Sequence, residues 1–224
     1  MKVMFFEPRF TPDTPRLLKR LGLVVDSDEA IDFLQILDKA VPLARPKAAF
    51  IEAHVDRAAE DGTVTIDGVD FFSRLLASNL RGVETVWPYM VTCGREIYDF
   101  AMAIPDPFER YWADEIMQEA LAVSRAALDS HLSENVYGGK TAFMSPGSIE
   151  DWPIGEQAPM FRLLGSAPER LGVTLTDSLL MLPNKSVSGI RFPNEDGYVN
   201  CQLCSRDRCP SRKAPYDAEA ALGM

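Results

Sequence analysis

Positive charge is scarce in this sequence, and its scarcity excludes several kinds of partner. Of 224 residues, 23 are lysine or arginine and 33 are aspartate or glutamate, which gives a formal net charge of −10. Because such a surface repels a polyanion, nucleic acid is not an expected partner. Apolar runs are also short. None approaches the roughly 18 residues that cross a bilayer, so no membrane partner is expected either.

The N-terminus lacks the features of an export signal. The opening residues, MKVMFFEPRF, contain a very short apolar run that ends at Glu7 and Pro8. A secretory signal needs a longer apolar region and a cleavage site. We therefore expect a cytoplasmic protein. Apolar residues make up 46% of the chain, which is enough to build an ordinary globular core.

Cysteine is rare and unevenly placed. Three of the four cysteines form a C-x2-C-x4-C cluster within nine residues, and Cys93 stands alone. Such a cluster fits two disulfides poorly, whereas clustered thiolates bind metals in a reducing compartment. We therefore predict one metal centre, for which zinc and an iron–sulfur cluster both remain open; the alternative is a tail of reduced, unliganded thiols. The predicted ligands are Cys201, Cys204, Cys209 and, as the fourth, Cys93.

Helices and strands are predicted in no regular alternation. Apolar residues at helical spacing indicate helices over residues 14–21, 28–41, 67 or 70 to 80, 95–103, 108–132 and 156–164. Segments rich in β-branched and aromatic residues indicate strands over 48–55, 63–66, 83–92, 175–181 and 186–192. Within one of these strands, Pro88 predicts an edge, a bulge or a break. This order fits an α+β fold better than a doubly wound parallel sheet.

Several well-known nucleotide and nucleophile motifs are missing. Gly139-Lys140-Thr141 resembles the end of a phosphate loop, but the glycine required five residues earlier is Glu134. Two other segments, 145–148 and 182–189, are rich in small and turn-forming residues, which allow a backbone to approach a ligand closely. The alternative for both segments is a tight connection without a ligand.

Taken in order, the segments from Trp87 onward resemble the activation domain of cobalamin-dependent methionine synthase, over residues 83–192. The N-terminal part resembles short stand-alone forms of that domain. The motifs that carry the resemblance are Ser145-Pro146-Gly147, Trp152-Pro153, MFRLL at 160–164, LGVTLT at 171–176 and MLPNKSVSG at 181–189.

This resemblance implies a fold, a ligand and a partner. It implies mixed helices with a twisted antiparallel sheet, and a shallow groove that binds S-adenosylmethionine (AdoMet). In that family the domain presents the methyl group of AdoMet to reduced cobalamin on a neighbouring cobalamin-binding domain. The residues expected to contact the ligand here are Lys140, Ser145, Pro146, Gly147, Ser148, Lys185 and Ser186.

One departure from the family weakens the expected ligand site. The family's ligand loop reads R-x-x-x-G-Y, and its arginine meets the carboxylate of AdoMet. With the glycine aligned on Gly147, the arginine position holds Phe143 and the tyrosine position holds Ser148. We therefore expect the affinity for AdoMet to be weak or lost, because neither residue replaces a guanidinium fork. Lys140 supplies a charge, but as a point charge in another place.

Three functions are compatible with these patterns. The first is a stand-alone relative of the activation domain, an accessory that acts in trans on a cobalamin-carrying methyltransferase or methionine synthase subunit. The second is a metal-bearing docking module that has lost the ligand. The third is an electron-transfer accessory with an iron–sulfur centre. Within the chain, we expect an N-terminal portion of the domain over 1–82, an activation-domain-like core over 83–195 and a cysteine-rich tail over 196–224.

Overall fold

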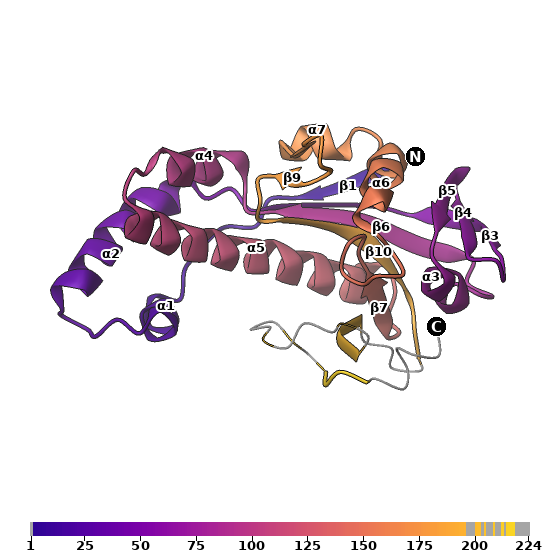
Figure 1. The fold of residues 1–224 in the computed structure, drawn as a ribbon, viewed down its shortest axis with the longest axis horizontal. Helices are drawn as coiled ribbons and strands as arrows, with labels where there is room; N and C mark the ends of the chain where they lie inside the picture. Colours follow the sequence, from indigo (N-terminus) through magenta and orange to yellow (C-terminus); the bar gives the residue numbers. More distant parts are fainter. Residues whose placement is uncertain are drawn as a thin grey trace.

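A computed structural model describes residues 2–195, 200–202, 204, 208, 212 and 214–217 (Figure 1). Its centre is an eight-stranded sheet in which the paired strands are antiparallel. The strands of this sheet are β1 (Val3–Phe6), β2 (Lys47–Ile51), β3 (Ala53–Ala58), β4 (Thr63–Ile66), β5 (Val69–Phe72), β6 (Thr85–Thr92), β7 (Thr141–Met144) and β10 (Ser186–Pro193). A separate two-stranded sheet pairs β8 (Thr174–Leu175) with β9 (Met181–Leu182). The predicted α+β class and antiparallel sheet are confirmed.

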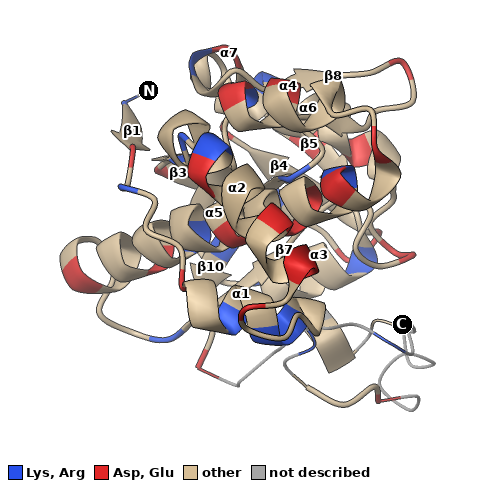
Figure 2. Cartoon of the chain, turned by 90° about the vertical axis from the view of Figure 1, so that its left-hand side faces the viewer, with Lys and Arg blue, Asp and Glu red and all other residues tan. Residues whose placement is uncertain are grey.

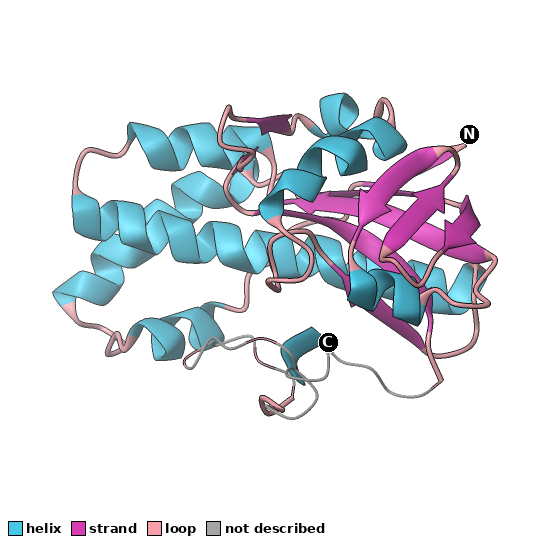
Figure 3. Cartoon of the chain, turned by 45° about the vertical axis from the view of Figure 1, so that its right-hand side comes forward, coloured by secondary structure: helices cyan, strands magenta, loops and turns pink. Residues whose placement is uncertain are grey.

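Helices cover both faces of the large sheet. They are α1 (Thr14–Leu21), α2 (Asp28–Ala40), α3 (Arg74–Asn79), α4 (Arg95–Ala103), α5 (Pro107–Asn135), α6 (Gln157–Leu164) and α7 (Ala167–Leu171), with 3-10 turns η1 (Val41–Leu43), η2 (Ile154–Glu156) and η3 (Asn200–Gln202). Helix α5 packs on one face, against β1, β2 and β6, whereas α6 and α7 lie on the other (Figure 1). Helices α1, α2 and α4, labelled in Figure 1, gather beyond one end of the sheet, and Figure 3 shows the same group of helices. Among the described residues, no helix combines the length and apolarity needed to span a membrane.

The central strand β6 divides the core into two layers. Side chains alternate between the faces of a strand, so neighbouring residues of β6 enter different clusters. Trp87 and Tyr89 belong to the cluster that packs under α5. Val86 and Met90 belong to the cluster that packs under α6 and α7. Strand β6 is therefore buried on both faces, which explains its nearly continuous run of apolar residues.

Helix α5 is held in place at its beginning and along its side. Asp106 precedes it, and a carboxylate oxygen of Asp106 accepts a hydrogen bond from the Phe108 N–H (2.8 Å). Arg20 of α1 pairs with Glu115 (2.9 Å) and Glu119 (3.2 Å) of α5. Figure 2 shows the basic positions of the chain in blue and the acidic positions in red. These contacts hold α5 against the part of the sheet formed by β1, β2 and β6.

Pro88 lies inside the central strand β6, so the predicted edge is wrong, but the pairing of β6 with β2 and β3 is interrupted opposite Pro88, as the alternative of a break predicts. The ladder between β2 and β6 reaches Phe50 opposite Tyr89, and β3 takes over at Ala53 opposite Val86. The Val55 N–H donates to the Glu84 carbonyl on the β3 side, and peptide groups alternate sides along a strand. The nitrogen of Pro88 therefore faces the place where β6 changes partner, and a missing donor is tolerated there.

The predictions for several short segments are also wrong in detail. Residues 48–55 form the two strands β2 and β3 rather than one, and the helix predicted from residue 67 or 70 begins only at Arg74. The helix begins late because a hairpin turn at Asp67-Gly68 joins β4 to β5 before it. The φ angles of these two residues are 44° and 74°. Residues 175–181 contain only the ends of β8 and β9, and β7 has no sequence signal of its own. All these strands are too short to show a clear hydrophobic period.

Candidate functional site

The candidate site lies where one edge of β10 is open. On one side, β10 pairs with β6 over Ser186 to Arg191, but on the other side β7 pairs only with Ile190 to Pro193. On that side the first residues of β10 therefore pair with no described strand, and the loop that follows β7 lies beside them. A cavity of about 440 Å3 occupies this place, hereafter called the edge cavity. Its volume is within the usual range for small-molecule sites.

The edge cavity brings together both segments that the sequence singled out. It is lined by Arg125, Phe143, Ser145, Pro146, Gly147, Ser148, Ile154, Gln157, Leu179, Leu180, Met181, Asn184, Ser186, Val187 and Ser188. Five of the seven predicted ligand residues, at positions 145–148 and 186, are in this set. Their contact with a ligand remains a prediction.

The two predicted lysines lie elsewhere. The Nζ atom of Lys185 pairs with Oδ2 of Asp114 on α5, at 2.7 Å. Lys140 precedes β7, and its backbone bonds to the segment after β10, where its carbonyl accepts from the Asn194 N–H (2.9 Å). Neither lysine lines the edge cavity, so neither places its charge inside it.

Two glycines let the loop after β7 close against the sheet. At Gly189, a Cβ atom would lie 2.4 Å from the Met144 carbonyl oxygen and 2.7 Å from Ser145 Oγ. Gly147 has a φ of 79°, and its N–H donates to the Trp152 carbonyl at 2.7 Å. The loop therefore depends on close backbone approach at one glycine and on a left-handed conformation at the other.

Replacing Gly189 with alanine is expected to lower the free energy of unfolding by about 1–3 kcal/mol, because the new methyl group overpacks the contact between β10 and the loop. Urea denaturation measures this effect. The matched control is Gly138→Ala, since a Cβ at Gly138 meets nothing within 4 Å. Equal stability of the two variants would contradict the described packing.

Hydroxyl and amide groups supply most of the polar lining. Ser188 Oγ donates to Gln157 Oε1 at 2.7 Å, and Ser186 bonds to Thr92 at 2.9 Å, both inside the protein. The Ser145 side chain is 8% exposed, yet its Oγ has no hydrogen-bond partner among the described residues. A buried hydroxyl without a partner is costly, so Ser145 is a candidate for a contact with a bound group.

Arg125 is a residue of the edge cavity that sequence reasoning missed. It projects from α5, and its guanidinium carbon lies 5.8 Å from the centre of the Phe143 ring. The cavity also has an apolar rim after β8, where Leu179 has an unusual φ of 62° and Leu180 is 57% exposed. No local motif marks Arg125, because only the packing of α5 on the sheet brings it to the loop.

The cysteines are placed in two different regions. Cys93 follows β6, is fully buried, and donates a hydrogen bond from its N–H to the Lys185 carbonyl (3.0 Å). Cys201 and Cys204 lie after β10, in a turn in which the Cys204 N–H donates to the Cys201 carbonyl (3.4 Å). Arg212 donates to the Cys201 carbonyl at 2.9 Å and to the Cys204 carbonyl at 3.0 Å.

The predicted metal centre remains a prediction. Cys209 lies outside the described residues, and among those described no three His, Cys, Asp or Glu side chains gather as a metal-binding group. Cys93 lies at the Ser186 end of β10, whereas the chain leaves toward Cys201 from the Pro193 end. Cys93 can act as the fourth ligand only if the segment that carries Cys201 and Cys204 approaches the Ser186 end of β10.

Burial raises the pKa of the Cys93 thiol to about 12. Because the folded pKa is above the unfolded one, this thiol stays protonated at pH 8, and its contribution to stability is lost only as the pH rises above the unfolded value. We expect iodoacetamide to leave Cys93 unmodified at pH 8 in the folded protein and to alkylate it in denaturant. Peptide mass spectrometry distinguishes the sites, and rapid alkylation of Cys93 in the folded protein would contradict its burial.

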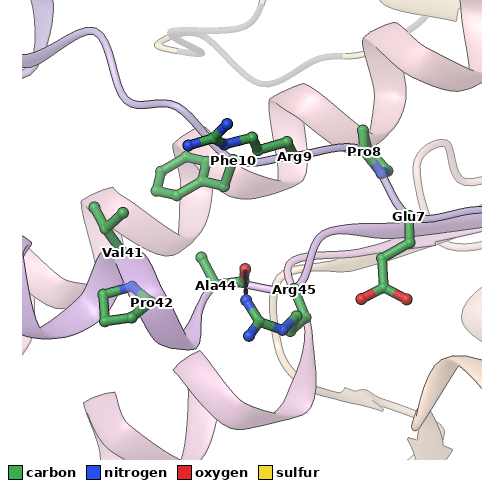
Figure 4. Close-up of a pocket in the computed structure, with 8 residues that line it drawn as sticks. All are labelled: Glu7, Pro8, Arg9, Phe10, Val41, Pro42, Ala44 and Arg45. Carbon is green, nitrogen blue, oxygen red and sulfur yellow. Dashed lines mark hydrogen bonds between the residues drawn. The ribbon is translucent and has the colours of Figure 1, made fainter.

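A second cavity, of about 320 Å3, lies between the segment after β1 and the segment that includes η1 (Figure 4). Glu7, Arg9 and Arg45 line it, and all three are exposed to solvent. None of the residues singled out by the sequence reaches it. It is therefore useful below as a control region.

Comparisons with known proteins agree with this description. The family model for the vitamin B12 dependent methionine synthase activation domain matches residues 130–213. The crystal structure of the MetH reactivation domain bound to AdoHcy has a similar fold, with a TM-score of 0.60 and 14% sequence identity, over 88% of this chain and 80% of that chain. A search of curated proteins found no match. The resemblance to the activation domain is thus confirmed, by sequence over residues 130–213 and by fold over most of the chain.

Proposed function

We propose that this chain binds AdoMet in the edge cavity and assists the reductive remethylation of cobalamin on a partner methyltransferase. The observation that carries the proposal is the convergence of the 145–148 loop with residues 184–188 of β10 and its preceding turn. Every residue that lines the cavity, except Arg125, lies within the segment that matches the activation-domain family. The similar reactivation domain is one that binds AdoHcy, which is AdoMet without its methyl group.

The proposed reaction has a simple balance. One external electron reduces inactive cob(II)alamin on the partner to cob(I)alamin. The cobalt(I) electron pair then takes the methyl group from the sulfonium of AdoMet, so that a cobalt–carbon bond forms, a sulfur–carbon bond breaks, and AdoHcy is released. This chain contributes binding and orientation, because the nucleophile and the methyl donor carry the chemistry themselves.

The test uses a cobalamin-loaded methyltransferase recovered from the same cell with this chain as bait. The partner in its cob(II)alamin state is mixed with a one-electron reductant, AdoMet labelled in the methyl group, and this chain. We expect labelled methylcobalamin to form only when the chain is present, and added AdoHcy to slow its formation. Labelling at the same rate without the chain, or failure to recover a cobalamin-bearing partner in any cobalt state, would contradict the proposal.

A second candidate function is a metal-bearing docking or electron-transfer module. The observation that favours it is the position of η3, which contains Cys201 and contacts β7, the strand whose Phe143 lines the edge cavity. A metal held by the cysteine cluster would therefore lie beside the proposed ligand site. Purification without oxygen distinguishes the docking module from the electron-transfer module. Brown protein with broad visible absorbance supports an electron carrier, and colourless protein with zinc supports a docking module.

A further inference from the structure

Of the described residues that line the edge cavity, one is charged. Among the residues that line it, Arg125 is charged and the others are apolar, hydroxyl, amide or backbone groups. Among the described residues, no carboxylate lines the cavity. A cavity with this composition favours a ligand that carries an anionic group.

Two arginines lie over the Phe143 ring, and they differ in their other partners. Arg191 also lies over Phe143, at 5.2 Å, but it pairs with Asp129 and bonds to Thr141. Arg125 has no carboxylate partner among the described residues, and its contact there is with the Phe143 ring. The aromatic ring holds the guanidinium near the cavity while leaving its N–H donors for another group.

A second feature on the same side of the chain points to the same kind of ligand group. Phe143 and Ser145 are two residues apart, at the end of β7, and residues with this spacing lie on one face of an extended strand. The Ser145 hydroxyl is more than nine-tenths buried, lines the cavity and has no partner among the described residues. The edge cavity is thus lined both by a cation and by a hydroxyl donor that is not used elsewhere among the described residues, and both kinds of group bind carboxylates.

We infer that Arg125 binds the carboxylate of the ligand in the edge cavity, with the Ser145 hydroxyl as a second donor. The inference rests on the proposed function for the identity of the ligand, and it adds the residue that provides the charge. Phe143 occupies the position where the related family has its arginine, and here it supports Arg125 instead. In this chain the positive charge that meets the carboxylate thus comes from helix α5, whereas in the related family it comes from the loop.

The experiment compares two probes by titration calorimetry. AdoHcy carries the carboxylate, and 5′-methylthioadenosine shares the adenosine and thioether but lacks the amino acid end. Arg125→Met is expected to weaken AdoHcy binding roughly 10- to 150-fold, the usual effect of losing a hydrogen bond to a charged group, and to leave methylthioadenosine binding unchanged. Arg125→Lys is expected to fall between, because it keeps the charge without the fork.

Arg16→Met is the matched control, since Arg16 is an exposed arginine of α1 that does not line the cavity. It should bind both probes like the wild type, and circular dichroism checks that all variants are folded. Wild-type affinity of Arg125→Met for AdoHcy, or an equal loss for both probes, would overturn the inference while leaving the proposed function intact. Failure of the wild-type protein to bind either probe would overturn both.

Discussion

Replacing Trp152 with alanine is expected to lower the free energy of unfolding by about 3–5 kcal/mol. Trp152 is fully buried, and its ring packs edge-on against Phe71 with the centroids 6.1 Å apart. Removing a side chain of this size leaves a cavity that the core under α6 and α7 cannot fill by relaxation. The same residue anchors the loop beside the edge cavity through its carbonyl, which accepts from the Gly147 N–H.

Denaturant unfolding measures the effect, with Phe108→Ala as the control. Phe108 is 76% exposed, and its truncation is expected to change stability by no more than about 0.5 kcal/mol. Trp152→Phe should cost less than the alanine variant, because it keeps an aromatic ring and removes an indole N–H that has no partner among the described residues. If Trp152→Ala were as stable as Phe108→Ala, the described core would be wrong.

Replacing Cys204 with serine is expected to abolish the proposed metal site. Wild-type protein prepared without oxygen should carry about one metal centre. The variant should carry almost none, because a structural metal site loses most of its affinity for the metal when one thiolate ligand is removed. The fold of residues 2–190 should persist, since the described strands and helices of that segment do not use Cys204.

Metal analysis and thiol titration decide this prediction, and a Cys93→Ala variant tests the fourth ligand. Loss of metal from that variant would support Cys93 as a ligand, and full retention would exclude it. Wild-type protein with less than about a tenth of an equivalent of zinc plus iron, and four free thiols when titrated in denaturant, would contradict the metal site.

The long, periodic elements of this fold could be predicted from the sequence. The helix expected over 95–103 matches α4, and the one over 108–132 lies within α5. In both, the apolar spacing repeats often enough to define the buried face. Pro88 by itself does not distinguish an edge from a break, because its effect depends on where β2 and β3 meet along β6, which is a property of the assembled sheet.

The candidate site could be predicted only in part, for a related reason. The 145–148 loop and residues 184–188 are visible in the sequence because their small and turn-forming residues are contiguous. Arg125 is far from both along the chain, and α5 brings it to Phe143 only in the folded protein. Lys140 is the charged residue that lies close to the 145–148 loop in the sequence, but it does not line the edge cavity.

The central claim is that the edge cavity binds an AdoMet-type ligand, and hydrogen exchange with and without AdoHcy tests it most directly. Backbone amides at 147–148 and 179–188 should exchange more slowly with AdoHcy, because a ligand there covers the open edge of β10 and the loop beside it. Amides at 41–45, beside the second cavity, should be unchanged. Protection at 41–45 with none at 147–148 and 179–188, or no protection anywhere at saturating AdoHcy, would contradict the account.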